Sequence, residues 1–120
     1  ILTIGATAHN ASEAIRKIES ENNISIAHYD IRYLKPLDEE LLHEVGKKFN
    51  KIITIEDGVI HGGFGSAVLE FMADNGYLVQ IKRLGIQDTF VEHGTPEELY
   101  QMLGLDTDGI ATSILDFYGK

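Results

Sequence analysis

The sequence has 120 residues, 43% of them hydrophobic, which is enough to bury one core but too few for two, so a single domain over residues 1–120 is expected. It contains no cysteine, which excludes disulfides, a thiolate nucleophile, a zinc–cysteine site and an iron–sulfur cluster, and favours a reducing, cytoplasmic environment. The formal net charge of −9 would repel a nucleic-acid backbone, and no apolar run approaches the roughly 18 residues that span a bilayer, so neither nucleic acid nor membrane is an expected partner.

Short β-branched runs alternate with amphipathic stretches, a pattern typical of parallel strands joined by crossover helices. A compact apolar run predicts a buried strand over residues 1–6. A helix should follow, because apolar residues recur at intervals of three and four opposite charged ones. Its predicted buried face consists of Ala11, Ala14, Ile15 and Ile18.

The next two elements are a second strand and a second helix. Asn22 and Asn23 should end the first helix, and alternating isoleucines predict a strand over residues 24–29. The run Lys35–Asp38 predicts a helix start, because the fixed φ of proline suits a first turn and an acidic group complements the helix dipole. Gly46 is expected to end that helix.

A third strand is predicted over residues 51–56, followed by the glycine-rich segment 58–65. The helix after this segment should end at Asn75-Gly76. Its predicted buried face consists of Ala67, Val68, Phe71 and Met72.

The last elements are a strand over residues 79–84, a long polar loop and helical sequence up to residue 118. Thr95-Pro96-Glu97-Glu98 has the pattern of a capping box, with proline at the first helical position. A final helix is predicted from about residue 109 to residue 118, with Ile110, Ile114, Leu115 and Phe117 as its apolar positions.

Together these elements predict an α/β fold in which helices cover both faces of an open twisted sheet, mainly parallel, with strand order 2-1-3-4. In that order the chain winds away from the first strand in both directions. The loops at residues 5–8 and 56–65 then flank the switch point, where such folds usually bind ligands.

The most conspicuous segment, Glu56–Ser66, leaves a strand and enters a helix. It lacks the lysine and Ser/Thr of a P-loop, and Val68 stands where a dinucleotide fingerprint needs its third small residue. A glycine-rich turn that packs helix and strand closely, or that serves as an interface, is favoured over nucleotide binding. The candidate interface or switch-point residues are Glu56, Asp57, Gly58, His61, Gly62, Gly63, Phe64, Gly65, Ser66, Glu92 and His93.

Glu56, Asp57 and His61 could form an acid/base cluster or a metal site, because carboxylates and imidazole near a switch point can titrate near neutrality. Strand-end carboxylates more often bind backbone amides, and His93 is expected to pack within its loop beside the capping box. No serine-nucleophile elbow and no HExxH spacing is present. No residue of this chain is therefore assigned as catalytic, cofactor-binding or metal-binding.

Four stretches of the sequence resemble one family, the C-terminal domain of 1-deoxy-D-xylulose-5-phosphate synthase, within the transketolase superfamily. The first two also resemble the β subunit of 2-oxo acid dehydrogenases, whereas the third is the discriminating one. The four stretches are Asp30–Leu42, Thr54–Phe71, Leu84–Asp106 and Asp108–Ile114.

The resemblance implies a fragment of a larger three-domain, homodimeric, cytoplasmic enzyme that uses thiamine diphosphate and Mg²⁺. Members of the family condense pyruvate with D-glyceraldehyde 3-phosphate and release carbon dioxide, for isoprenoid, thiamine and pyridoxal synthesis. The GDG motif that holds the magnesium diphosphate in the family is not present here, and Glu56-Asp57-Gly58 is only a superficial likeness. The resemblance therefore implies that this domain supports the preceding catalytic domains and extends the dimer contact, with no cofactor of its own.

Two alternatives remain open. One is a module that binds a small anionic regulator at the helix start in Gly62–Ser66, because an open helix N-terminus attracts anions. The other is a dehydrogenase β subunit, which would have a lipoyl enzyme as its partner.

Overall fold

The computed structural model describes residues 1–5, 7–31, 37–59, 63–86 and 96–119. Within them, four parallel strands form one sheet in the order β2-β1-β3-β4, which confirms the predicted order. The strands are β1 (Leu2–Ile4), β2 (Tyr29–Asp30), β3 (Lys51–Val59) and β4 (Gln80–Ile86). The helices are α1 (Thr7–Glu21), α2 (Glu39–Lys48), α3 (Phe64–Asp74), α4 (Pro96–Leu103) and α5 (Thr107–Tyr118).

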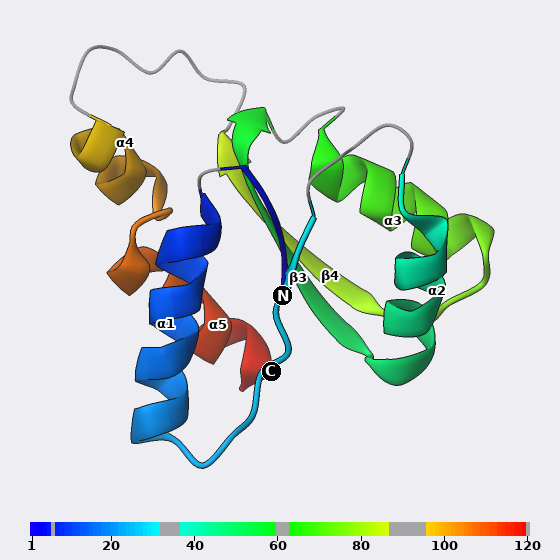
Figure 1. The fold of residues 1–120 in the computed structure, drawn as a ribbon, viewed down its shortest axis with the longest axis horizontal. Coiled ribbons are helices and arrows are strands. Elements are labelled where there is room, and N and C mark those ends of the chain that lie inside the picture. The colour runs from blue at the N-terminus through cyan, green and yellow to red at the C-terminus, as the bar shows by residue number, and fades with distance from the viewer. Residues whose placement is uncertain (6, 32–36, 60–62, 87–95, 120) are drawn as a thin grey trace.

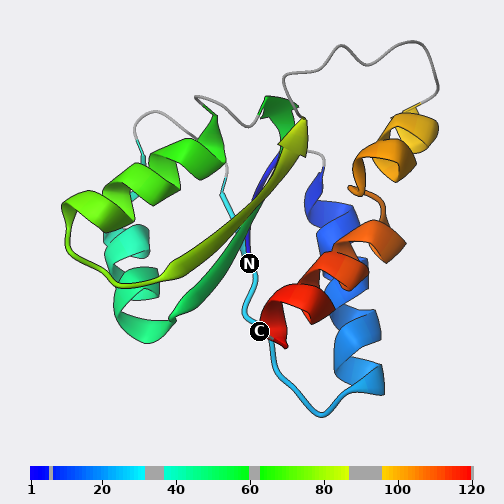
Figure 2. The same cartoon turned by 180° about the vertical axis from the view of Figure 1, so that it is seen from behind.

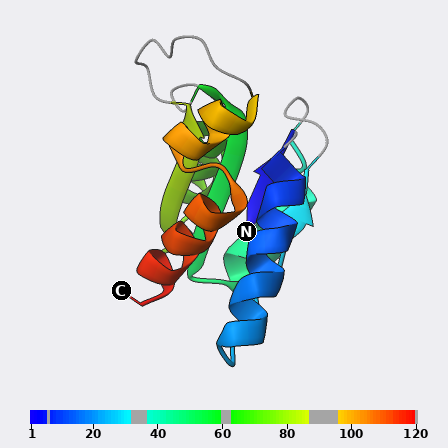
Figure 3. The same ribbon diagram turned by 90° about the vertical axis from the view of Figure 1, so that its left-hand side faces the viewer.

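Helices lie on both faces of this sheet. α1 and α5 pack on one face, and α2 and α3 lie on the other (Figures 1 and 2). Figure 3 views the molecule from the side of α1 and α5, with α4 above α5. The arrangement is the three-layer α/β/α fold that the sequence predicts.

The sheet divides the expected single core into two clusters, because successive strand side chains point to opposite faces. In β3, Ile53 and Ile55 pack toward α1 and α5, whereas Ile52 packs toward α2 and α3. The first cluster holds Ala11, Ala14, Ile15, Ile18, Ile53, Ile55, Leu105, Ile110, Ala111 and Ile114. The second holds Leu2, Ile31, Leu42, Val45, Ile52, Phe64, Val68, Phe71 and Met72.

The predicted inward faces of two helices are largely confirmed. All four predicted positions of α1 are buried, and its alanines pack in one cluster with Ala111 of α5, where small side chains allow close helix packing. In α3, Val68, Phe71 and Met72 are buried, while Ala67 is only partly so. The α3 helix ends as predicted, with Gly76 at φ +73° after the cap.

Gly46 does not end its helix, which is a correction to the prediction. α2 continues to Lys48, and a Cβ built on Gly46 would lie 2.7 Å from Cδ2 of the Tyr77 ring. The glycine therefore serves close packing inside the helix. The helix begins at Glu39, directly after the predicted run, so proline is not in its first turn; Asp38 is the N-cap, and its carboxylate accepts from Leu41 N at 3.1 Å, while Lys35 and Pro36 lie outside the described residues.

The strand predicted over residues 24–29 is wrong in extent, because β2 contains only Tyr29 and Asp30. Ile24 and Ile26 do face the cluster beside α1, as their alternation suggests. Their backbones are held differently: Ile24 N donates to Asn22 O and Ile26 N donates to the Glu19 carboxylate. The alternation of apolar residues thus predicted correctly that these side chains face the core, but it did not predict correctly that the segment is a strand.

The remaining differences concern element ends. β1 is shorter than predicted because Gly5 turns the chain at φ +84°, and β3 runs three residues further than predicted. α5 begins at Thr107 because the Asp106 carboxylate caps it through Gly109 N. Leu115, one of the predicted apolar positions of this helix, is 43% exposed. α4 begins at Pro96 as expected, while Thr95 lies outside the described residues.

Candidate functional site

The predicted switch-point segment is described in two parts. Glu56, Asp57 and Gly58 belong to the end of β3, and Gly63 to Ser66 form the start of α3. Ile4 of β1 lies beside Glu56 in the sheet, so the carboxyl ends of β1 and β3 adjoin as predicted. His61, Gly62, Glu92 and His93 lie outside the described residues.

The Glu56 carboxylate is buried, with 4% of the residue exposed, and joins the end of β3 to the start of α3. Its Oε2 accepts a hydrogen bond from Phe64 N at 2.5 Å. An anionic group is favourable there, because the first amides of a helix lack helical partners and carry the positive end of its dipole. Of the two interpretations of these carboxylates, the structure supports the amide-binding one for Glu56.

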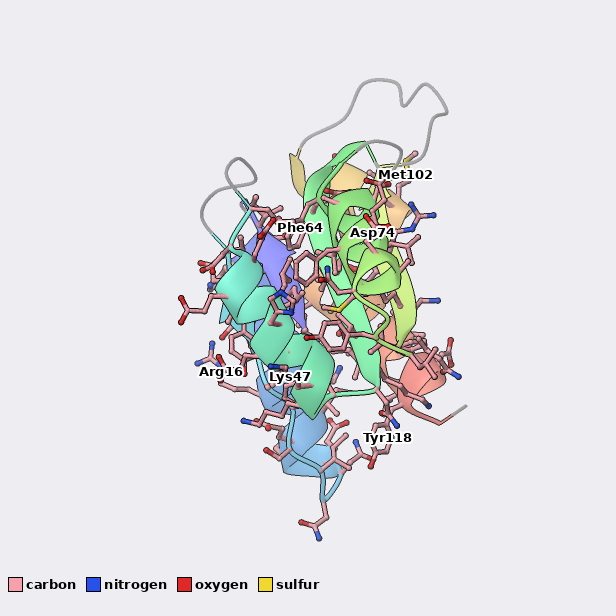
Figure 4. All side chains as sticks on the ribbon, turned by 90° about the vertical axis from the view of Figure 1, so that its right-hand side faces the viewer. Arg16, Lys47, Phe64, Asp74, Met102 and Tyr118 are labelled. Atoms are coloured by element: carbon pink, nitrogen blue, oxygen red, sulfur yellow. The ribbon has the colours of Figure 1, made fainter. Side chains whose placement is uncertain are left out.

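Phe64 anchors the same junction on its apolar side. Its side chain is 1% exposed and lies between α2 and α3 above the sheet (Figure 4). Burying a phenylalanine contributes about 1.5–3 kcal/mol, so the first turn of α3 is held by packing as well as by its cap.

Gly65 allows α3 to approach the sheet closely. A Cβ on Gly65 would lie 2.7 Å from Oγ1 of Thr54 and 2.9 Å from Cγ of Arg83. Arg83 then reaches along β4 to the helix, where Nη1 donates to Oγ of Ser66 at 3.0 Å. The glycine, the serine and the arginine together fix the helix start on β3 and β4, which is the close-packing role predicted for the segment.

A second polar cluster, absent from the sequence-based candidates, lies between β1 and β2. Oγ1 of buried Thr3 lies 2.9 Å from Nε2 of His28 and donates to Oδ1 of Asp30 at 3.4 Å. Burial, the largest cause, lowers the pKa of His28 below its ordinary value; the amine of Ile1 lowers it further and Asp30 opposes this. Because Thr3 is fully buried, its hydroxyl cannot reach a substrate, so the cluster supports the sheet edge.

Sequence reasoning missed this cluster because it depends on register. Leu2 pairs with Tyr29 and Thr3 with Asp30, and these pairs are about 27 residues apart in the chain. The observable signal was a buried strand bearing Thr3 next to a predicted strand bearing His28, with Asp30 just after it, and the predicted strand order placed these two strands side by side.

The described residues do not form a metal centre: no three of their histidine, aspartate or glutamate side chains are grouped closely enough to hold an ion. Glu56 already binds the first amide of α3, so this end of the helix does not offer that amide to a diphosphate. The described part of the switch point therefore does not fit a magnesium diphosphate.

The comparison with family models gives one decisive match. The model for the C-terminal domain of transketolase matches residues 1–110. The chain belongs to the transketolase C-terminal domain family.

Curated members of the same kind are close in sequence. The chain is 58% identical over 110 residues to the 1-deoxy-D-xylulose-5-phosphate synthase of Bacteroides fragilis, covering 92% of this chain and 17% of that enzyme. Against the synthase of Syntrophotalea carbinolica it is 42% identical over 117 residues, 98% of this chain and 18% of that enzyme. The chain thus spans less than a fifth of the length of these relatives.

A solved structure carries the same fold. The chain from a split-gene transketolase, described as an inactive β4 tetramer, superposes with a TM-score of 0.86 at 30% identity, covering 97% of this chain and 37% of that one. The transketolase C-terminal fold is therefore shown by sequence and structure together. Within the described residues, no helix has both the length and the apolarity to cross a membrane.

Proposed function

We propose that this chain is the C-terminal domain, residues 1–120, of a 1-deoxy-D-xylulose-5-phosphate synthase, in which it supports the catalytic domains and extends a homodimer contact. The observation that carries the proposal is 58% identity over 92% of the chain to a synthase of that name. The whole enzyme would condense pyruvate with D-glyceraldehyde 3-phosphate in the cytoplasm, releasing carbon dioxide and supplying isoprenoid, thiamine and pyridoxal synthesis.

The structure supports a non-catalytic part for this chain. Glu56 binds the first amide of α3, Ser66 binds Arg83 and Gly65 allows close packing, so these three residues hold α3 on the sheet. Thiamine diphosphate and Mg²⁺ would then be held by the preceding domains of the longer protein.

The proposal is tested by dividing the longer protein. The full-length protein should release carbon dioxide from pyruvate only when D-glyceraldehyde 3-phosphate is present, and should sediment as a dimer. The 120-residue chain alone should give no calorimetric heat with thiamine diphosphate and Mg²⁺. Micromolar binding by the isolated chain, or full activity after its deletion, would refute the division of labour.

The alternative of an anion-binding regulatory module gains no support from the α3 N-terminus. A small anion there would compete with the Glu56 carboxylate for Phe64 N, and like charges repel strongly at such a separation. Titration of the isolated chain with inorganic phosphate, followed by the amide resonance of Phe64, decides between the two. A saturable shift of that resonance would favour the module.

A further inference from the structure

The turn that joins α3 to β4 contains the dipeptide Asn75-Gly76, which is chemically reactive. Asn75 is the C-cap of α3, and both residues are exposed, at the right-hand edge of the ribbon in Figure 1. The chain has five asparagines, and only this one is followed by glycine. Because glycine has no Cβ, its backbone nitrogen is the least hindered one that can approach the side-chain carbonyl of a preceding asparagine.

The reaction that this dipeptide favours is deamidation. The Gly76 nitrogen attacks Cγ of Asn75 and loses its proton as the new N–Cγ bond forms, while the Cγ–Nδ2 bond breaks and the side-chain amide leaves as ammonia. Water then opens the resulting succinimide ring at either of its carbonyls. The products are aspartate, or isoaspartate, in which the main chain continues through the former side chain. Water is the only co-reactant.

In the folded chain both reacting groups are held in the helix cap. Asn75 Nδ2 donates to Phe71 O at 2.8 Å, and Gly76 N donates to Ala73 O at 3.2 Å. The ψ angle of Asn75 is 8°, so the Gly76 nitrogen lies on the side of the Asn75 backbone nitrogen and not on the side of its Cβ. Ring closure therefore requires the cap to open and ψ to rotate.

The turn leads directly into a contact between α3 and α2. Tyr77 N donates to Met72 O at 3.0 Å, and the Tyr77 Oη lies 2.7 Å from Nδ1 of His43 on α2. The Tyr77 ring also lies over Gly46 of α2, where a Cβ would be 2.7 Å from Cδ2 of the ring. The chain between the end of α3 and Tyr77 is thus fixed at both ends.

Either product would weaken this contact. A carboxylate at residue 75 stands at the negative end of the α3 dipole directly after Asp74, and the last turn of α3 has no basic residue. The carboxylate also lacks the N–H that binds Phe71 O. Isoaspartate in addition inserts one backbone methylene before Tyr77, so the ring keeps its place on α2 only if α3 shifts.

We propose that Asn75 is a site of spontaneous deamidation, that opening of the α3 cap sets its rate, and that the product loosens the contact of Tyr77 with α2. The inference goes beyond the proposed function and does not depend on it, because the reacting groups and the bonds that hold them all belong to residues 71–77.

The test compares the folded chain with a synthetic peptide of residues 70–80, both incubated at mildly alkaline pH. Mass spectrometry of the proteolytic fragment that contains residue 75 measures the conversion. The folded chain should react about five to a hundred times more slowly than the peptide, as two cap hydrogen bonds of ordinary net strength imply. Asn10 and Asn50, which precede alanine and lysine, should remain intact over the same period.

Two results would overturn the site or its control by the cap. A folded chain still unmodified at residue 75 after about a hundred half-lives of the peptide would refute the site, because the cap bonds do not account for a larger difference. Equal rates in the chain and the peptide would refute control by the cap.

Variants separate the cap from the reactive dipeptide. Tyr77→Phe removes the hydroxyl beside His43 and leaves Asn75-Gly76 intact, so the folded chain should deamidate at least about twofold faster. Tyr118→Phe, at a 59% exposed residue of α5, should keep the parent rate. Equal rates for these two variants would show that the Tyr77 contact does not hold the cap.

The consequence is measured on the deamidated chain after chromatographic separation. Its thermal midpoint should lie at least about 2 °C below that of the parent, and the resonances of His43 and Tyr77 should shift. Asn75→Gln, which would have to close a larger and less favourable ring, should stay unmodified and keep its midpoint through the same incubation. A deamidated chain with the midpoint and resonances of the parent would refute the loosened contact.

Discussion

Glu56 connects the end of β3 to the first amide of α3, and its charge is well placed against the helix dipole. Glu56→Gln keeps an acceptor but removes the charge, so we expect a loss of about 0.5–1 kcal/mol in the free energy of unfolding. Glu56→Ala also removes the acceptor of the buried Phe64 N–H, so we expect the free energy of unfolding to fall by about 2–3 kcal/mol. Urea denaturation of the 120-residue chain measures both.

Glu70→Gln is the matched control, because Glu70 is an exposed glutamate of the same helix. It should change the unfolding free energy by less than about 0.5 kcal/mol. Equal effects of the Glu56 and Glu70 substitutions would show that the bond to Phe64 N does not stabilise the junction.

His28 should make the stability depend on pH. Its pKa is lowered in the fold, chiefly by burial, so the unfolded chain binds more protons once the pH falls to the ordinary value of 6.5 and below. The contribution of neutral His28 is therefore fully present above pH 6.5 and is lost as the pH falls through 6.5 toward the lowered pKa in the folded state. Denaturation midpoints between pH 7.5 and pH 5 should fall less steeply in His28→Gln than in the parent chain.

His9→Gln is the comparison for this slope, since the His9 side chain is 73% exposed on α1. The His9→Gln variant should keep the steep fall of the denaturation midpoint with pH that is due to His28. If His28→Gln and the parent chain gave parallel curves, the lowered pKa of His28 would have no consequence for stability.

At the scale of elements, α3 can lie close to the sheet because Gly65 has no side chain. Gly65→Ala would place a Cβ against Thr54 Oγ1 and Arg83 Cγ, so we expect a loss of about 1–3 kcal/mol from overpacking. Adding Thr54→Ala removes the nearer of these two atoms and should restore part of the loss. Urea denaturation of the two single variants and the double variant measures the coupling.

Gly119→Ala is the control for this series. Gly119 follows α5 at φ −76°, and its Cβ would meet only Leu115 O at 3.3 Å, so alanine should be tolerated within about 0.5 kcal/mol. A Gly65→Ala variant as stable as Gly119→Ala would contradict the close approach of α3.

The C-terminal end of α5 depends on Lys51. Its Nζ donates to two of the last carbonyls, where a cation also complements the helix dipole. Lys51→Met keeps the apolar stem and removes the charge, so we expect a loss of about 1 kcal/mol and faster hydrogen exchange in the last turn of α5. Lys47→Met, an exposed change on α2, should leave that exchange unchanged.

The helices and their inward faces were predictable because they depend on local periodicity, as the buried residues of α1 show. Gly46 was misassigned because its role is set by Tyr77, 31 residues away, and no local pattern reports a contact at that distance. The predicted extent of β2 was wrong for a similar reason, since Ile26 N donates to the Glu19 carboxylate and not to a neighbouring strand. Local signals therefore place the elements, while tertiary contacts decide where each one ends.

The candidate site shows the same division. Glu56 as a ligand of a backbone amide followed from the tendency of strand-end carboxylates to bind nearby N–H groups. Its specific partner Phe64 N, and the bond from Arg83 to Ser66, required the helix to be packed on β3 and β4.

At the scale of the whole molecule, β3 joins the two core clusters, with Ile52 on one face and Ile55 on the other. Because both helical layers pack on this one strand, we expect them to unfold together in a single cooperative transition. Val68→Ala weakens the layer of α2 and α3, and Ile110→Val weakens that of α1 and α5, each by about 0.5–2 kcal/mol. Native-state hydrogen exchange measures the opening free energy of each layer separately. In either variant the opening free energies of the most protected amides should fall by the same amount in both layers. A fall confined to the substituted layer would mean that the two layers open independently.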